Sequence, residues 1–261
     1  MNPEPDHPHD HQQGGELYRL PMFPLGSVLF PGLGLPLRVF EPRYRQMIEE
    51  CVAGDRTFGV VLIERGSEVG GGEVRLRVAT VAHILDASTQ EDGTIGVFAV
   101  GTGRVEVLEW LPDAPYPAAM VTSLDDEPYP ISDGDVADGL TSATGGTQHA
   151  RFRHPSSATS DPQTPSDHRN DHGDAADAIA AIVRRLRFTL AQRAEANLAA
   201  APATIELSPD SDVALWQVCA LVPATPFDDY GLLATRSVSE RLEALGELLD
   251  ASADEVRFHL S

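Results

Sequence analysis

The sequence predicts an α+β protein, in which a small, mostly antiparallel β-barrel with one early helix is followed by a bundle of α-helices. Two patterns lead to this prediction. Over residues 17–127, short segments rich in β-branched residues recur at regular spacing between turns that contain glycine or proline. Over residues 175–261, apolar residues recur at helical spacing instead. The chain therefore divides into a β-rich subdomain and a helical subdomain.

The β-rich subdomain opens with brief extended segments that lead into the early helix. Residues 22–25 and 28–30 are apolar but are bounded by glycines and prolines, which confine regular structure to short strands. Pro42 suits the first position of a helix. The apolar residues around it recur as on one helix face: Phe40, Tyr44, Met47, Ile48 and Cys51.

A series of short strands is expected after this helix. They cover residues 58–63, 73–78, 81–85, 95–100, 105–108 and 118–123. The sequence Glu-Asp-Gly-Thr at residues 91–94 supplies a hairpin turn between two of them. Strands joined by such turns pair antiparallel, so these segments predict a meander.

The segment Gly101-Thr102-Gly103-Arg104 has two interpretations. A GxG turn exposes backbone N–H groups that can bind phosphate. That interpretation requires a third glycine and a following helix, whereas here another strand pattern follows. Isolated glycines within strands usually mark bulges, so we favour a β-bulge between two strands.

Three helices are expected in the helical subdomain. The first opens at Asp174 or Asp177, the second begins at Asp212, and the third starts at the capping sequence of residues 237–240. Residues 226–231 contain proline, aspartate and glycine, and they form the predicted connection between the second and third helices.

Two polar segments lie outside this pattern. Residues 1–16 are rich in proline, histidine and glutamine, and residues 128–174 in aspartate, glycine, serine and threonine. Neither segment has the apolar side chains needed to offset the entropy of ordering it. We therefore expect a disordered tail and a disordered linker or insertion.

The composition excludes several classes of partner. The formal net charge of -21 repels nucleic-acid phosphates and anionic lipids. No run approaches the roughly 18 apolar residues of a membrane helix, and residues 1–15 lack the features of a secretory signal. Cys51 and Cys219 fall on apolar helical faces, which predicts reduced core thiols. We expect a cytoplasmic protein that binds neither nucleic acid nor membranes.

The absence of lysine bears on enzymatic function, because all 19 basic residues are arginine. A Walker A loop, a Schiff-base enzyme and a Ser-Lys dyad each need a lysine amine. The sequence also lacks GxSxG and HExxH motifs. The histidines at positions 7, 9, 11, 168 and 172 lie in polar sequence without a metal-binding context. We expect no enzymatic activity, no cofactor and no metal site.

Two segments carry a close resemblance to a known family: LPMFPLGSVLFPG and LPLRVFEPRYRQMIEEC. They resemble the start of the Lon N-terminal domain, which is the substrate-binding module of the ATP-dependent Lon protease. The motif FEPRYRQM is most similar to the stand-alone and RING-linked versions of that module. The similarity continues through VATVAHILDASTQEDGTIGVFAVGTGRVEVLEW and into the last helices. It implies a PUA-like β-barrel followed by a helical bundle, without the ATPase and peptidase of the protease.

The resemblance implies a non-enzymatic module that recognises unfolded or degron-bearing polypeptide, or a separate partner protease. We predict that Phe30, Leu33 and Phe40 bind the polypeptide, because exposed apolar side chains on a surface braced by proline and glycine mark interaction sites. The alternative for each of them is that it fills the barrel core. A small-ligand or nucleotide-binding domain, a hydrolase without a sequence motif and a homodimer stay open at this point.

Overall fold

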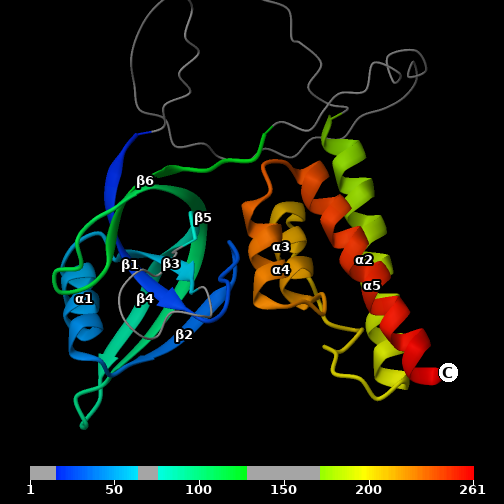
Figure 1. Cartoon of the computed structure of the whole chain (residues 1–261), viewed down its shortest axis with the longest axis horizontal. Coiled ribbons are helices and arrows are strands. Elements are labelled where there is room, and N and C mark those ends of the chain that lie inside the picture. The colour runs from blue at the N-terminus through cyan, green and yellow to red at the C-terminus, as the bar shows by residue number, and fades with distance from the viewer. Residues whose placement is uncertain (1–15, 64–75, 128–170) are drawn as a thin grey trace, which may run out of the picture.

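The protein consists of a β-rich part and a helical part that lie side by side (Figure 1). The structure is a computed structural model that describes residues 16–63, 76–127 and 171–261. The tail to residue 15, the first half of the strand predicted at residues 73–78 and the linker to residue 170 lie outside the described residues.

A mixed six-stranded sheet forms the β-rich part. Its strands are β1 (Tyr18–Leu25), β2 (Gly34–Val39), β3 (Thr57–Leu62), β4 (Val78–Thr89), β5 (Ile95–Trp110) and β6 (Ala118–Ser123). Their order is β2-β5-β4-β3-β1-β6, and β6 also pairs with β5, so the sheet curls. Every pair is antiparallel except β1 with β3. The prediction of a mostly antiparallel sheet is confirmed.

The early helix is α1 (Pro42–Ala53), with Pro42 in its first turn as the sequence predicts. Tyr44, Met47, Ile48 and Cys51 are buried against the inner face of the sheet. Phe40 was expected on the same face, but it is exposed. The reason is that Phe40 precedes the N-cap residue Glu41, so the helical spacing does not extend to it.

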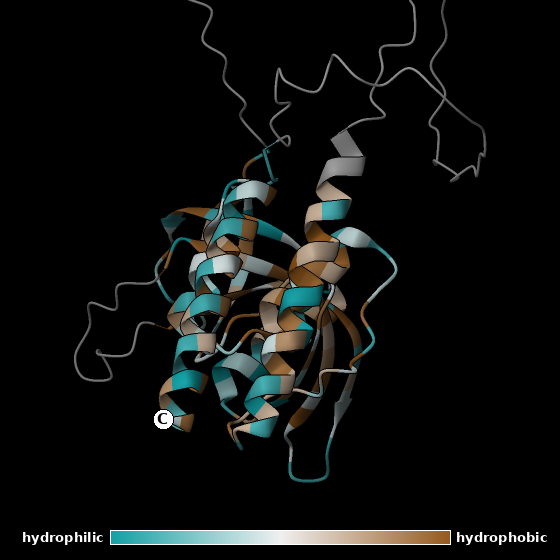
Figure 2. Cartoon of the chain, turned by 90° about the vertical axis from the view of Figure 1, so that its right-hand side faces the viewer, coloured by the Kyte–Doolittle hydropathy of each residue, from teal (hydrophilic) through white to brown (hydrophobic). Residues whose placement is uncertain are grey.

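Four helices form the helical part: α2 (Asp171–Glu195), α3 (Ser211–Leu221), α4 (Pro226–Ala234) and α5 (Val238–Leu260). The two long helices, α2 and α5, pack side by side (Figures 1 and 2). Hydrophilic and hydrophobic residues alternate along both of them, as expected of helices with one face in the core (Figure 2). Helix α2 begins at Asp171, before both predicted starts.

Helix α4 occupies the segment predicted as a connection, so that prediction is wrong. The hydroxyl of Thr225 accepts a hydrogen bond from the backbone N–H of Asp228, and the Asp228 carboxylate accepts one from the backbone N–H of Thr225. Pro226 occupies the first turn. A reciprocal capping box with proline in the first turn is a helix signal, and it outweighs the turn preference of the single residues.

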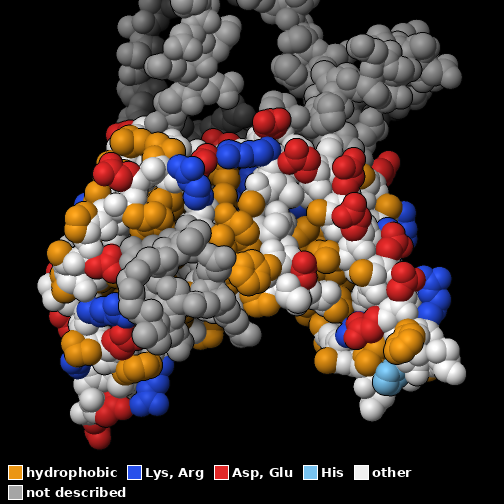
Figure 3. Space-filling view, viewed as in Figure 1, with side chains coloured by type: hydrophobic (Ala, Val, Ile, Leu, Met, Phe, Trp, Pro, Cys, Tyr) orange, Lys and Arg blue, Asp and Glu red, His pale blue; other side chains and the backbone are white. Residues whose placement is uncertain are grey.

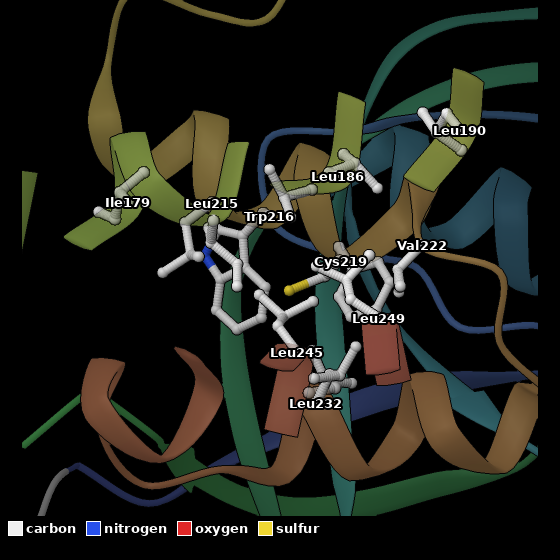
Figure 4. Packing of buried hydrophobic residues seen from close by; sticks show 14 of the residues in the cluster. Ile179, Leu186, Leu190, Leu215, Trp216, Cys219, Val222, Leu232, Leu245 and Leu249 are labelled. Atoms are coloured by element: carbon white, nitrogen blue, oxygen red, sulfur yellow. The ribbon is translucent and has the colours of Figure 1, made fainter. Parts of the chain in front are cut away.

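One hydrophobic cluster joins the two parts. In Figure 4, side chains from all four helices point toward one another, with Trp216 and Cys219 of α3 between Leu186 of α2 and Leu245 of α5. Phe30, Val78 and Leu124 of the β-rich part belong to the same cluster. Because burying apolar area stabilises a contact by about 25 cal/mol per Å², this shared core docks the helices onto the sheet.

Candidate functional site

In the turn before β2, the side chains of Phe30 and Leu33 point in different directions. The backbone N–H of Leu33 donates to the Phe30 carbonyl at 3.2 Å, and Gly32 has a φ of 77°. Pro31 and Gly32 are the favoured central residues of a type II turn with this geometry. Phe30 points into the shared cluster, whereas Leu33 stays half-buried at its margin.

Phe30 is therefore a core residue, with 2% of its surface exposed. Its ring stacks on Trp216 of α3 and cannot present itself to a partner. The interpretation of Phe30 as part of an exposed patch is corrected accordingly. Phe30 is buried because the helical part packs its apolar surface against this turn. The sequence alone does not show that the helical part lies next to the turn.

Gly101 of β5 holds the turn in place. Its backbone N–H donates to the Leu33 carbonyl at 2.9 Å, and its carbonyl accepts from the Gly32 N–H at 2.8 Å. A Cβ at Gly101 would lie 2.6 Å from the Phe30 carbonyl oxygen, so only glycine allows this approach. The turn that leads into β2 is thus fixed to the neighbouring strand.

The Gly101-Thr102-Gly103 motif is a β-bulge inside one continuous strand. Val81 pairs with Gly103 and Ala82 pairs with Gly101, which leaves Thr102 as the extra residue. The predicted bulge is confirmed. The phosphate-loop interpretation does not fit, because it requires a helix after the glycines and β5 continues there.

Strand β2 lies at the edge of the sheet, because within the described part of the chain it pairs only with β5. Leu33 lies just before β2 and Phe40 just after it. From residue 33 to residue 40 the chain advances seven residues, a span of about 23 Å at about 3.3 Å per strand residue. The structure therefore places these two predicted residues at opposite ends of one edge strand.

Phe98 of β5 lies between these two ends and is missed by the sequence reasoning. It pairs with Pro36, and its ring lies so close to Gly34 that a Cβ there would be 3.0 Å from it. The Phe98 side chain is 46% exposed. Val97 and Ala99 are buried, so the alternation of strand residues was the signal that could have placed Phe98 outside.

Leu85 extends this apolar row onto β4. Its neighbours Ile84 and Asp86 pair with Ala99 and Phe98, which makes Leu85 the extra residue of a second bulge. Its side chain is exposed as well. We call the following residues the β2 surface: the exposed Pro36, Phe40, Leu85 and Phe98, and Leu33, which is half-buried at one end of the strand.

The charged side chains next to the β2 surface form ion pairs and hydrogen bonds. Arg38 and Asp92 form an exposed ion pair at 2.7 Å. Thr94 donates to Asp92 through its hydroxyl and its backbone N–H, and these hydrogen bonds lower the pKa of Asp92 to about 2. The Asp92 carboxylate is therefore ionised at neutral pH and braces the hairpin turn beside β2.

The helical part presents a strongly acidic face. Figure 3 shows carboxylates gathered over the long helices, and on α5 the exposed acidic residues recur at helical spacing. They include Glu240, Glu243, Glu247, Asp250 and Asp254. Together with the net charge of -21, this face favours basic partners over acidic ones.

A buried group of charges also ties the two parts together. Arg104 of β5 and Arg241 of α5, whose side chains are 3% and 1% exposed, both donate to Asp126 at 2.6 Å. Arg104 also donates to the carbonyls of Leu233 and Thr235 at the end of α4. Burial lowers the pKa of Arg104, and the nearby Asp126 opposes that effect. These contacts hold the sheet and the helices in one arrangement.

The two cysteines are buried and form no disulfide, as predicted for core thiols. Burial raises the pKa of Cys51 to about 11 and that of Cys219 to about 12. Neither thiol is therefore ionised at neutral pH, and a thiolate is the reactive form.

Neither a metal cluster nor a membrane-crossing helix is found among the described residues. In that part of the chain, no group of His, Cys, Asp and Glu is arranged to hold a metal ion. None of the described helices combines the length and the apolar character needed to cross a membrane. The histidines at positions 7, 9, 11 and 168 and the side chain of His172 lie outside what the structure describes.

The fold and the docked helices define an α+β protein built from a curled mixed sheet, one early helix and an appended helical bundle. A family model described as the ATP-dependent protease La (LON) substrate-binding domain matches residues 19–251. The chain belongs to this family. The match covers both the β-rich part and the helical part, as the resemblance in the sequence implies.

Two Lon proteases are similar to part of the chain. Lon protease from Cytophaga hutchinsonii is 35% identical over 109 residues, and Lon protease 2 from Myxococcus xanthus is 34% identical over 110 residues. Each match covers 41% of this chain and 13% of the protease. The chain thus corresponds to a small share of the length of these relatives.

Two solved structures share the fold over most of the chain. A Lon N-terminal domain protein from Xanthomonas campestris is 22% identical with a TM-score of 0.50, covering 87% of this chain and 96% of that one. The N-terminal domain of the Mycobacterium avium complex Lon protease is 15% identical with a TM-score of 0.50, covering 89% and 98%. The helical part therefore belongs to the shared fold together with the sheet.

Proposed function

We propose that this chain is a non-enzymatic polypeptide-recognition module that binds apolar segments of unfolded or degron-bearing proteins at the β2 surface. The observation that carries the proposal is the group of exposed apolar side chains beside an edge strand, those of Pro36, Phe40, Leu85 and Phe98. Membership of a family described as a substrate-binding domain supports it. A bound segment would then pass to a separate protease.

The affinity of such a surface is expected to be modest. A small apolar surface leaves little binding free energy after the entropy cost of association has been subtracted. We therefore expect micromolar dissociation constants, which correspond to a binding free energy of about 8 kcal/mol. The net charge of -21 favours basic clients. Added salt should weaken this electrostatic part and leave the hydrophobic part in place.

The proposal is tested with a short fluorescent peptide in which leucine and threonine alternate between terminal arginines, followed by fluorescence anisotropy. Phe40→Ser and Phe98→Ser are each expected to weaken binding about tenfold, which is about 1.4 kcal/mol. Phe188→Ser on α2 is the matched control, because Phe188 is 65% exposed and Phe40 is 67% exposed. Its affinity should equal that of the unmodified protein.

Thermal melts of the three variants show whether each one is folded. The proposal fails if the unmodified protein does not bind the peptide, or if Phe188→Ser weakens binding as much as the two β2-surface variants do.

A further inference from the structure

Strand β2 directs alternate backbone groups away from the sheet. Residues of an antiparallel pair alternate between those that exchange hydrogen bonds with the partner strand and those that face the other way. The bond from the Gly101 N–H to the Leu33 carbonyl sets this alternation. Leu35 and Leu37 share the inward phase of Leu33, since they lie two and four residues further along. The outward residues are Gly34, Pro36 and Arg38.

Pro36 agrees with this assignment. Proline has no N–H, so within sheets it occupies edge-strand positions where that group would point away from the ladder. The outward row then offers N–H donors from Gly34 and Arg38, and carbonyl acceptors from all three residues. An extended backbone is the partner that matches donors and acceptors repeated at strand spacing.

We propose that the client segment binds as an added β-strand along the outer edge of β2, an inference that rests on the proposed function. The backbone of the segment pairs with Gly34, Pro36 and Arg38. One face of the segment then meets Phe98, whose ring lies over Gly34. Backbone pairing supplies an affinity that tolerates many sequences, and the exposed apolar side chains select for apolar segments.

The occupant is an extended, apolar, neutral or basic segment of another protein. A second copy of this chain would bring another net charge of -21 to the edge, and the two copies would repel. Pro36 also removes a donor from each edge in such a pairing, which is a common way to blunt an edge strand against self-association. A basic foreign segment meets no charge repulsion of this kind.

A pair of substitutions at one position tests the backbone contact. Arg38→Pro removes an outward N–H, while the inward bonds of β2 to β5 remain. Arg38→Ala is the matched control, because it removes the same side chain and its ion pair with Asp92 but keeps the N–H. In the anisotropy assay, Arg38→Pro should bind the peptide about tenfold more weakly than Arg38→Ala. Equal affinities of two folded variants would overturn the inference.

A change in the peptide gives a second test, which does not depend on the variants folding. Two versions of the probe peptide carry N-methyl groups, one on the odd residues and one on the even residues. Alternate N–H groups of an added strand face β2, so one version should lose binding and the other should keep it. If both versions bind like the parent peptide, side chains alone hold the segment and the inference is wrong.

The outcomes separate the inference from the proposed function. When the parent peptide fails to bind the unmodified protein, the proposed function fails. When the parent binds and Phe40→Ser weakens it, but methylation has no effect, only the strand-addition inference fails. Sedimentation that shows a dimer dissociated by Arg38→Pro would assign the edge to a second copy and overturn the inference as well.

Discussion

The rings of Phe30 and Trp216 stack with their centroids 5.7 Å apart and their planes inclined by 24°. Phe30 comes from the turn that leads into β2, and Trp216 comes from α3. The helical part therefore supports the start of the edge strand, although no helix contributes a residue to the β2 surface. A change in the packing of α3 should therefore shift the position of Leu33, which is the last residue of the same turn.

Phe30 and Phe40 are expected to differ sharply in their contribution to stability. Phe30→Ala should lower the free energy of unfolding by about 3 kcal/mol, because truncating a buried phenylalanine leaves a cavity. Phe40→Ala removes an exposed ring and should change the free energy of unfolding by no more than about 0.5 kcal/mol. Urea denaturation followed by tryptophan fluorescence measures both. Similar values for the two variants would contradict the placement of Phe30.

Asp126 is expected to be critical because it is the shared counter-charge of two buried arginines. Asp126→Asn keeps the size of the side chain but leaves Arg104 and Arg241 without a compensating charge. The free energy of unfolding should fall by about 3 kcal/mol, even though the Arg241 guanidinium also lies 3.7 Å from the Trp216 ring centroid. Chemical denaturation at neutral pH measures the loss.

The control for Asp126→Asn is Asp250→Asn. Asp250 pairs with Arg185 on the surface of the long helices, where both side chains are well exposed. Exposed ion pairs contribute between zero and about 1 kcal/mol. A loss at Asp126 no larger than the loss at Asp250 would show that the buried group of charges does not hold the two parts together.

Replacing Asp229 is expected to raise the stability of the protein by an amount that depends on pH. Burial, with a smaller effect of the Asp228 carboxylate, raises the pKa of Asp229 to about 6. The pKa in an unfolded chain is about 3.9, so folding favours the protonated form. This contribution to stability is complete below about pH 4 and is lost as the pH rises through about 6. Asp229→Asn, which mimics the protonated side chain, should therefore be more stable than the unmodified protein at pH 8, by about 1 kcal/mol because solvent screens this partly exposed carboxylate.

The measurement for Asp229→Asn is the difference in melting temperature from the unmodified protein between pH 4 and pH 8. That difference should be close to zero at pH 4 and positive at pH 8. A difference that does not change with pH would mean that Asp229 is not held in a raised-pKa environment.

Local signals in the sequence predict much of this fold. The hairpin at residues 91–94, the bulge at Gly101-Thr102-Gly103 and the start of α1 each depend on turn or cap residues within a few positions of one another. The sequence also places all four buried residues of α1 correctly, because helical spacing decides them.

The candidate site depends on contacts that are distant in sequence. Phe30 packs against Trp216, 186 residues further along the chain, and no local pattern brings the two together. Phe98 joins the β2 surface only because β5 pairs with β2 in one particular register. The prolines and glycines around them therefore indicated Leu33 and Phe40 as candidates, while their arrangement along an edge strand required the paired sheet.

Two glycines of one motif give the sharpest test of how the turn before β2 is held. A Cβ on Gly101 would lie 2.6 Å from the Phe30 carbonyl oxygen, whereas a Cβ on Gly103 would meet nothing within 4 Å. Neither glycine is among the residues of positive φ, so only the contact distinguishes them. Gly101→Ala should lower the free energy of unfolding by about 2 kcal/mol, since relieving the clash means moving the turn. Gly103→Ala should change it by no more than about 0.5 kcal/mol.

The same pair of variants links stability to binding. In Gly101→Ala, the displaced turn loses the hydrogen bond from the Gly101 N–H to Leu33, so hydrogen exchange of that amide should accelerate. Leu33 should shift with the turn, and the alternating leucine-threonine peptide should bind Gly101→Ala more weakly than Gly103→Ala. Unchanged exchange and equal peptide affinity in the two variants would show that the turn is held by Phe30 and Trp216 alone, without the support of β5.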